Sequence, residues 1–184
     1  MAEPLLLGQY HDAVTGALKK IAWVRDADAY PEKNVPRFTG LTTPAVYFSI
    51  NGWEQGGGNE GQLNVNLSCD LFVVVDAAGA GVSRPEIFLR TAAADITQWI
   101  DGQQFGLTSL EPAVFIDASR DEFDPRMDDY LVWRISFTQS AAFGADPFAQ
   151  INSPLNGVWL GKAPNIGRAH VDDYQLIYEA KPDE

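Results

Sequence analysis

The clearest pattern in the chain is an alternation of apolar and polar residues over residues 62–76. Successive side chains of an extended segment point to opposite faces, so every second residue shares a face. The apolar face consists of Leu63, Val65, Leu67, Cys69, Leu71, Val73 and Val75. The other face is polar through Asp70 and turns apolar at Phe72 and Val74. The pattern predicts one long strand whose first half has a wet face and whose second half is buried on both sides, under a helix.

Residues 83–101 have the three-to-four-residue spacing of an amphipathic helix. Ser83, with Glu86 three residues later and Pro85 between them, predicts an N-cap and a capping box. The apolar stripe consists of Leu89, Ala92, Ala93, Ile96, Trp99 and Ile100. Gly102 follows the last of these residues and is expected to end the helix in the left-handed conformation. We expect this helix to cover the long strand.

The same two periodicities predict the remaining elements of the chain. They are a helix over residues 9–22, an extended segment over residues 23–30, and strands over residues 44–50, 112–117 and 130–137. A glycine-rich loop over residues 52–61 joins two of the strands and indicates an antiparallel hairpin. The predicted fold class is α+β, a single domain with a mostly antiparallel sheet of about four strands packed against two helices.

Beyond Ser140 the composition changes, because Gly, Pro, Asn and Ala become frequent and the aromatic residues lose any clear period. We interpret residues 1–140 as the α+β body. Residues 141–184 are interpreted as a C-terminal arm that packs on the body or on a neighbouring subunit.

The charge of the chain narrows its possible partners. Lys and Arg total 13 against 25 Asp and Glu, a net charge of −12, which argues against a surface that grips nucleic acid through its phosphates. DNA that merely passes such a surface is still compatible with this charge. Cys69 is the single cysteine and lies on the apolar face of the long strand, so we expect a packed small hydrophobe there. No signal peptide or membrane-spanning run is recognised, and the protein is expected to be cytosolic where it is made.

Several candidate chemical motifs do not meet the requirements of their chemistry. The loop with Gly56, Gly57 and Gly58 precedes a strand rather than a helix, so it offers phosphate no helix N-terminus. Gly79-Ala80-Gly81 lacks the third glycine of a dinucleotide-binding turn, because Arg84 occupies that position. Neither His11 nor His170 has partners at the spacing of a catalytic triad or a zinc motif. We therefore expect no catalytic residue, no cofactor, no metal site and no enzymatic activity.

An acidic stretch lies between the last two predicted strands. Its spacing does not match a calcium-binding loop. It is either a solvated hairpin tip or, as an enzymatic alternative, the metal site of a small hydrolase. The acids of interest are Asp117, Asp121, Glu122, Asp124, Asp128 and Asp129.

The order of elements resembles that of the tail terminator proteins of tailed bacteriophages, in particular the Mu-like tail-protein family of contractile phages, with the fold of lambda-type tail terminators. Several segments carry the likeness in addition to the strand Asp70–Asp76. They are Val24-Arg25-Asp26, Thr43-Pro44-Ala45-Val46-Tyr47, Val158-Trp159-Leu160-Gly161, Ala163-Pro164-Asn165-Ile166-Gly167, and His170 with Asp172-Asp173-Tyr174.

The resemblance implies a hexameric ring in the virion neck, assembled in the cytoplasm of the bacterial host. Such a ring caps the tail tube and the sheath, stops tail elongation and offers the head connector a docking surface. DNA passes through its lumen without specific binding, and no membrane is involved.

The resemblance also suggests roles for particular side chains. Aromatic residues dominate interface energetics, so Phe148, Trp159, Tyr174 and Tyr178 are expected at the subunit contact. Asp121, Glu122, Asp124, Asp128 and Asp129 are expected to face the lumen or a partner protein. An alternative is another neck protein, a head-completion or head–tail connector protein, that binds on the portal side.

Overall fold

The computed structural model describes residues 5–31, 38–57, 62–78, 82–121, 124–144 and 157–179. The chain divides into two compact units, Met1–Pro147 and Phe148–Glu184. The first unit is an α+β domain, which confirms the predicted fold class. We call this first unit the body.

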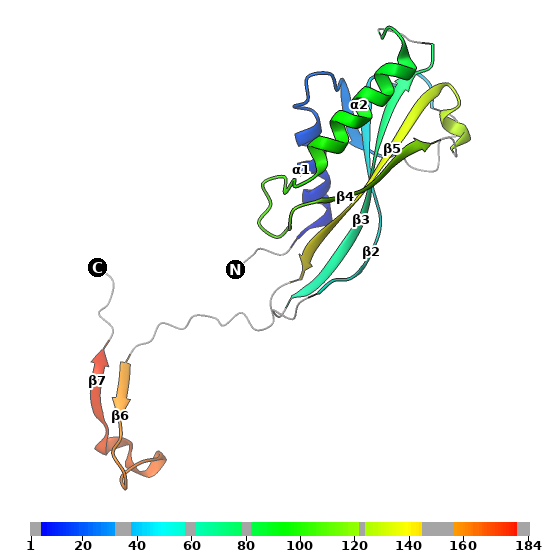
Figure 1. The fold of residues 1–184 in the computed structure, drawn as a ribbon. Coiled ribbons are helices and arrows are strands. Elements are labelled where there is room, and N and C mark those ends of the chain that lie inside the picture. The colour runs from blue at the N-terminus through cyan, green and yellow to red at the C-terminus, as the bar shows by residue number, and fades with distance from the viewer. Residues whose placement is uncertain are drawn as a thin grey trace. The chain divides into compact units, whose positions relative to one another are not determined.

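The body is built on a five-stranded sheet in the order β1-β2-β3-β5-β4 (Figure 1). The strands are β1 Asp26–Ala29, β2 Ala45–Gln55, β3 Leu63–Asp76, β4 Val114–Asp121 and β5 Tyr130–Phe143. β1 pairs with β2 in parallel, and the other three pairings are antiparallel. β1 is the strand that the sequence pattern described only as an extended segment.

The predicted long strand is confirmed as β3, the centre of the sheet. It pairs with β5 without a register shift, from Leu63 opposite Phe143 to Asp76 opposite Tyr130. Its predicted apolar face is buried from Val65 to Val75, and only Leu63, at its start, is exposed. The unbroken pairing of two 14-residue strands makes β3 and β5 the longest pair of the sheet.

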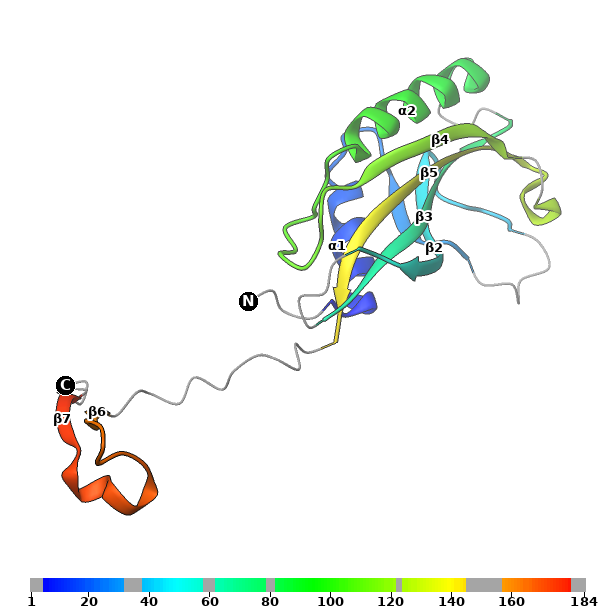
Figure 2. The same ribbon diagram turned by 60° about the horizontal axis from the view of Figure 1, so that its bottom comes forward.

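Two helices pack on one face of this sheet, α1 Leu7–Leu18 and α2 Pro85–Ile100 (Figures 1 and 2). The predicted stripe of α2 is confirmed, since its aliphatic members are buried and Trp99 is partly buried. The predicted cap is wrong: the N-cap is Arg84, in the left-handed conformation at φ 55° and without a side-chain cap bond. Gly102 has φ 83°, as the left-handed helix end requires. α1 begins and ends earlier than the predicted 9–22.

The second half of β3 is buried on its other face as well, but among the described residues no α-helix covers that face. Phe72 and Val74 pack with Phe38 and Met127, where Met127 belongs to the short 3-10 helix η1, Pro125–Met127. The prediction that the helix after β3 covers this strand is confirmed on the first face, where α2 packs, but the expected helix over the second face is wrong. A loop residue and a 3-10 turn supply the apolar surface, because two short segments are enough to cover this small cluster.

The predicted hairpin over residues 44–76 is confirmed as β2 and β3, but its loop is shorter than expected. β2 continues through Gly52 to Gln55, with a register shift between Ile50 and Gly52. Of the remaining loop, residues 58–61 lie outside the described part of the chain. β4 and β5 likewise run beyond the predicted ends at residues 117 and 137.

The second unit contains a two-stranded antiparallel sheet formed by β6 Gly157–Leu160 and β7 Gln175–Glu179. The 3-10 helix η2, Arg168–Asp173, lies between these strands in the chain. We call residues 157–179 the C-terminal hairpin. Its elements are drawn in orange and red in Figure 1.

Candidate interaction site

Both strands of the C-terminal hairpin are apolar without alternation. β6 carries Val158, Trp159 and Leu160 in succession, and β7 carries Leu176, Ile177 and Tyr178. A register shift lies opposite the step from Val158 to Trp159. Continuous apolar runs are typical of strands that are buried on both faces. The hairpin therefore carries more apolar side chains than a two-stranded sheet can cover by itself.

The strand register assigns these side chains to two faces. Val158 pairs with Tyr178, and Trp159 pairs with Leu176. A Cβ placed on Gly157 would lie 3.4 Å from both the Leu176 side chain and the Trp159 indole nitrogen, which puts those two on the same face. One face thus carries Trp159 and Leu176, and the other carries Val158 and Tyr178. The unpaired Ile177 lies between the two registers.

The tip of the hairpin is organised around Tyr174. Its ring lies against Gly161, where an added Cβ would be only 2.7 Å from a ring carbon. Its hydroxyl accepts a hydrogen bond of 2.8 Å from the backbone N–H of Gly167, a residue at φ 96°. His170 lies 3.2 Å from Asp173 in the same turn. These contacts give a physical role to residues that carried the sequence resemblance: they shape the tip.

A hollow of about 580 Å³ opens beside this turn. It is lined by Trp159, Val171, Asp172 and Tyr174. Three of the four residues are apolar or aromatic, and Asp172 adds a carboxylate acceptor. A hollow of this composition suits an aromatic side chain that carries a polar donor.

The four aromatic residues predicted at a contact differ in their exposure. Trp159 is 58% exposed and Tyr178 is 52% exposed, whereas Tyr174 is partly buried within the tip. Phe148 lies outside the described residues. Sequence reasoning missed the exposed aliphatic residues of the hairpin, which its continuous apolar runs could have indicated. These are Leu160, Ile166, Val171, Leu176 and Ile177.

A second exposed apolar patch lies at one end of the body's sheet. Trp53 on β2 is 55% exposed, and its ring meets that of Phe143 on β5 edge to face at 5.8 Å between centroids. Leu63 on β3, directly opposite Phe143, is 57% exposed. We call Trp53, Leu63 and Phe143 the sheet-end patch.

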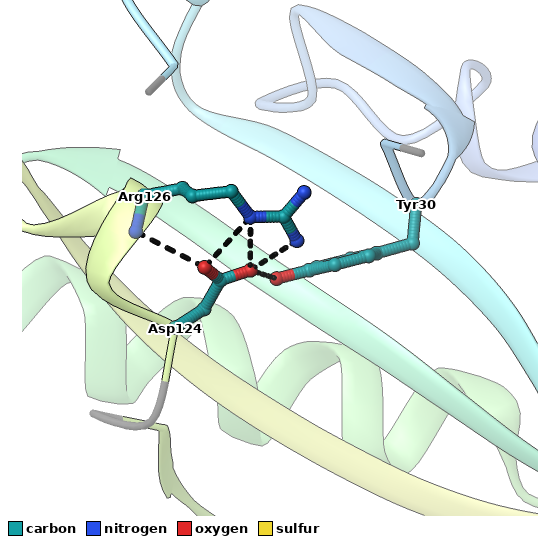
Figure 3. Close-up of polar contacts among 3 residues, drawn as sticks. All are labelled: Tyr30, Asp124 and Arg126. Carbon is teal, nitrogen blue, oxygen red and sulfur yellow. Dashed lines mark hydrogen bonds and ion pairs between the residues drawn. The ribbon is translucent and has the colours of Figure 1, made fainter. Parts of the chain in front are cut away.

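The acidic stretch is partly engaged inside the body, as Figure 3 shows. Asp124 accepts hydrogen bonds from the Arg126 guanidinium at 2.6 Å and from the Tyr30 hydroxyl at 2.9 Å, and it also caps η1 through the Arg126 N–H. The hydrogen bonds from Arg126 lower the pKa of Asp124 to about 2. Burial, and then the bond to Asp124, raises the pKa of Tyr30 above its ordinary value. This network ties the end of β1 to the turn before β5.

The other acids of this stretch lie differently. Asp128 and Asp129 are exposed, Asp121 is partly buried, and Glu122 lies outside the described residues. Asp117 is exposed, with a carboxylate oxygen 3.9 Å from the Arg134 guanidinium. The four described members of the predicted set therefore differ in their exposure, and the prediction that the set faces a lumen or a partner stays a prediction.

The remaining candidates for chemistry, Cys69 and His11, pack against the core of the body. Cys69 is buried, and burial raises the pKa of its thiol to about 12. His11 packs on Phe48 with 4.8 Å between ring centroids, and burial lowers its pKa. Among the described residues, no three His, Cys, Asp or Glu side chains are grouped so as to hold a metal ion. In the same part of the chain, none of the helices is long and apolar enough to cross a membrane.

No protein-family model matches this sequence, and no curated protein matches it. Among solved structures, one similar chain belongs to the virion of a native gene transfer agent particle. The two chains are 20% identical with a TM-score of 0.43, and the match covers 72% of this chain and 87% of the other. That TM-score is below the level at which two chains are taken to share a fold.

Proposed function

We propose that this protein is a structural component of a phage-like virion, a tail terminator that works as a closed ring of identical subunits. In this proposal the ring, of six subunits, caps the tail tube and, in a contractile tail, the sheath. It stops tail elongation and presents the surface on which the head connector docks. The protein acts by binding, and no chemical reaction is assigned to it.

The observation that carries the proposal is the exposed apolar surface of the C-terminal hairpin. No described residue of the hairpin is buried, although it holds seven exposed large hydrophobic side chains. An isolated two-stranded hairpin is marginally stable in water, and a contiguous apolar surface of this kind marks a contact with another protein. A hairpin of this composition is therefore expected to be ordered and covered in an assembly.

A ring suits this arrangement because a heterologous interface needs two different surfaces on each subunit. The C-terminal hairpin offers one such surface, with Trp159 and Tyr178 as aromatic anchors of the kind that dominate interface energies. The sheet-end patch of the body offers a second apolar surface. The sequence resemblance to tail terminators agrees with an assembly of this kind.

The charge of the subunit fits a channel for DNA. A net charge of −12 gives six subunits a strongly negative ring, to which DNA does not adhere. Asp128 and Asp129 are the exposed acids that we propose face the lumen or the tube. Asp124 serves the body instead, because Arg126 and Tyr30 bind it.

The proposal is tested by assembling tails with and without this protein. The tube and sheath proteins used are those of the same phage-like particle. Electron microscopy would measure the tube lengths. We expect uniform capped tails with the protein and overlong, headless tubes without it. Tails of normal length without the protein would contradict a terminator, and binding to the portal side but not to the tube would instead indicate a connector.

A further inference from the structure

We infer that Trp53 of one subunit inserts into the hollow beside Trp159, Val171 and Tyr174 on the C-terminal hairpin of a second copy of this chain. This inference rests on the proposed ring and specifies the contact that closes it. Each subunit then supplies one projecting side chain and one hollow.

The projecting side chain is held in place by its neighbours. Trp53 follows the register shift of β2 and pairs with Leu67, so it lies on the helix-covered face of the sheet, near the end of β2. Phe143 supports the indole from β5 at 5.8 Å between ring centroids. Yet 55% of Trp53 is exposed, as is 57% of Leu63. A tryptophan held on two long paired strands loses little conformational freedom on binding, which favours it as an anchor.

The hollow matches this side chain in size and chemistry. Its volume of about 580 Å³ exceeds what one indole needs, and Trp159, Val171 and Tyr174 supply apolar contact. A buried indole needs an acceptor for its N–H, and Asp172 at the hollow provides a carboxylate. Aromatic pairs add about 0.5–1.5 kcal/mol beyond the area they bury.

A second copy is the occupant because the hairpin is apolar on two faces, and a patch on its own body would cover only one of them. The two surfaces also differ in form, since the sheet-end patch projects a side chain and the hairpin offers a hollow. When each chain places its projecting Trp53 in the hollow of the next chain, always in the same direction, the contacts can close into a ring.

The test uses chemical cross-linking in a cysteine-free background. Cys69 is the only cysteine, and it packs as a small buried side chain, so Cys69→Ala supplies the background. One chain then carries Leu63→Cys beside Trp53, and another carries Val171→Cys at the hollow. The two are mixed at high concentration and treated with a short bis-maleimide. The matched control replaces Leu63→Cys by Ile87→Cys on α2, which is 54% exposed.

We expect covalent dimers from the Leu63→Cys and Val171→Cys mixture and about tenfold fewer from the Ile87→Cys mixture. Adding Trp53→Ala to the Leu63→Cys chain should reduce the yield about tenfold, and Trp53→Phe should restore part of it. Unchanged unfolding midpoints would show that these variants fold.

Two results would overturn the inference. One comes from a chain that carries both Leu63→Cys and Val171→Cys: a cross-link that forms only within that chain would mean that the hairpin docks on its own body. The other is the absence of a specific cross-link in a sample whose mass shows an assembled ring, which would place the contact elsewhere. Neither result decides the terminator function, which the tube-length experiment tests separately. Failure of the Trp53 contact can therefore be distinguished from failure of the proposed function.

Discussion

At the scale of single residues, the polar side chains inside the body hold its elements together. Gln139 is fully buried on β5, where it accepts a hydrogen bond of 2.6 Å from the Tyr10 hydroxyl of α1. Its amide group donates to the carbonyl oxygens of Gln103 and Glu111 at 2.9 and 2.8 Å. One side chain therefore joins α1, β5 and the connection between α2 and β4.

Replacing Gln139 by Leu should lower the free energy of unfolding by about 3 kcal/mol, because two carbonyl groups and the Tyr10 hydroxyl lose their partner. Tyr10→Phe removes the hydrogen bond to Gln139 and the weak contact with the Cys69 thiol, leaves both Gln139 amide bonds in place, and should cost about 1 kcal/mol. Urea unfolding followed by circular dichroism measures both. A Gln139→Leu variant as stable as Tyr10→Phe would show that this network contributes little.

The Asp124 carboxylate should contribute a pH-dependent part of the stability. Its pKa is about 2 in the folded protein and ordinarily 3.8, so its contribution is present above the ordinary value and disappears as pH falls toward 2. Asp124→Asn should therefore cost about 1–2 kcal/mol at pH 7, after allowance for solvent screening, and almost nothing near pH 2. Urea unfolding at a series of pH values measures this. The exposed control Asp128→Asn should change stability by less than about 0.5 kcal/mol, and a pH-independent effect of Asp124→Asn would contradict this account.

At the scale of elements, hydrophobic periodicity predicts the helices and strands whose own sequence has a regular apolar pattern. It predicts β3 and the stripe of α2, because their side chains alternate or recur regularly. It does not predict β1, since Asp26–Ala29 has no apolar pattern and becomes a strand only by pairing with β2. Nor does it predict the strand after Gly52, which β3 orders through a distant pairing. The predicted Ser83 capping box is also absent. The N-cap is Arg84, in the left-handed conformation, so Ser83 lies one residue too early to cap α2.

The candidate site was predictable only in part. Trp159 and Tyr178 stand out in the sequence as isolated aromatics, and both are exposed. The two strands around them are short, and a register shift breaks their alternation, so periodicity does not reveal them. The role of Tyr174 depends on its contact with Gly161, which is visible only in three dimensions.

Gly161→Ala should disorder the tip of the C-terminal hairpin while leaving the body folded. The added methyl group would lie 2.7 Å from the Tyr174 ring, which must move and release the Gly167 N–H from its hydroxyl. We expect the Gly167 amide proton to shift toward its random-coil position in NMR spectra, with the resonances of β3 and β5 unchanged. Lys162→Ala, on an exposed neighbouring residue, is the control, and an unshifted Gly167 signal in Gly161→Ala would refute the packing role.

At the scale of the whole molecule, two opposing forces act on association. A net charge of −12 makes subunits repel each other, whereas the exposed apolar side chains of the hairpin and the sheet-end patch favour contact. Salt screens the first force, since the Debye length falls from about 10 Å at 0.1 M to about 3 Å at 1 M. The balance between the two forces should set the conditions under which the proposed ring closes.

Raising sodium chloride from about 0.1 M to about 1 M should therefore increase the assembled fraction. Sedimentation velocity at a fixed protein concentration measures the change. Trp53→Ala should remain mostly monomeric across the whole range, because its association loses the anchor. Weaker association at high salt would indicate an interface held by ion pairs instead.

The most direct test of the account is the mass of the protein in solution, measured by light scattering over a wide range of protein concentrations at high salt. A ring built through the C-terminal hairpin predicts a species of about six times the 20.2 kDa subunit, and a chain ending at residue 147 should stay monomeric. A chain of all 184 residues that remains a monomer at every concentration would contradict the claim that the hairpin joins copies of this chain.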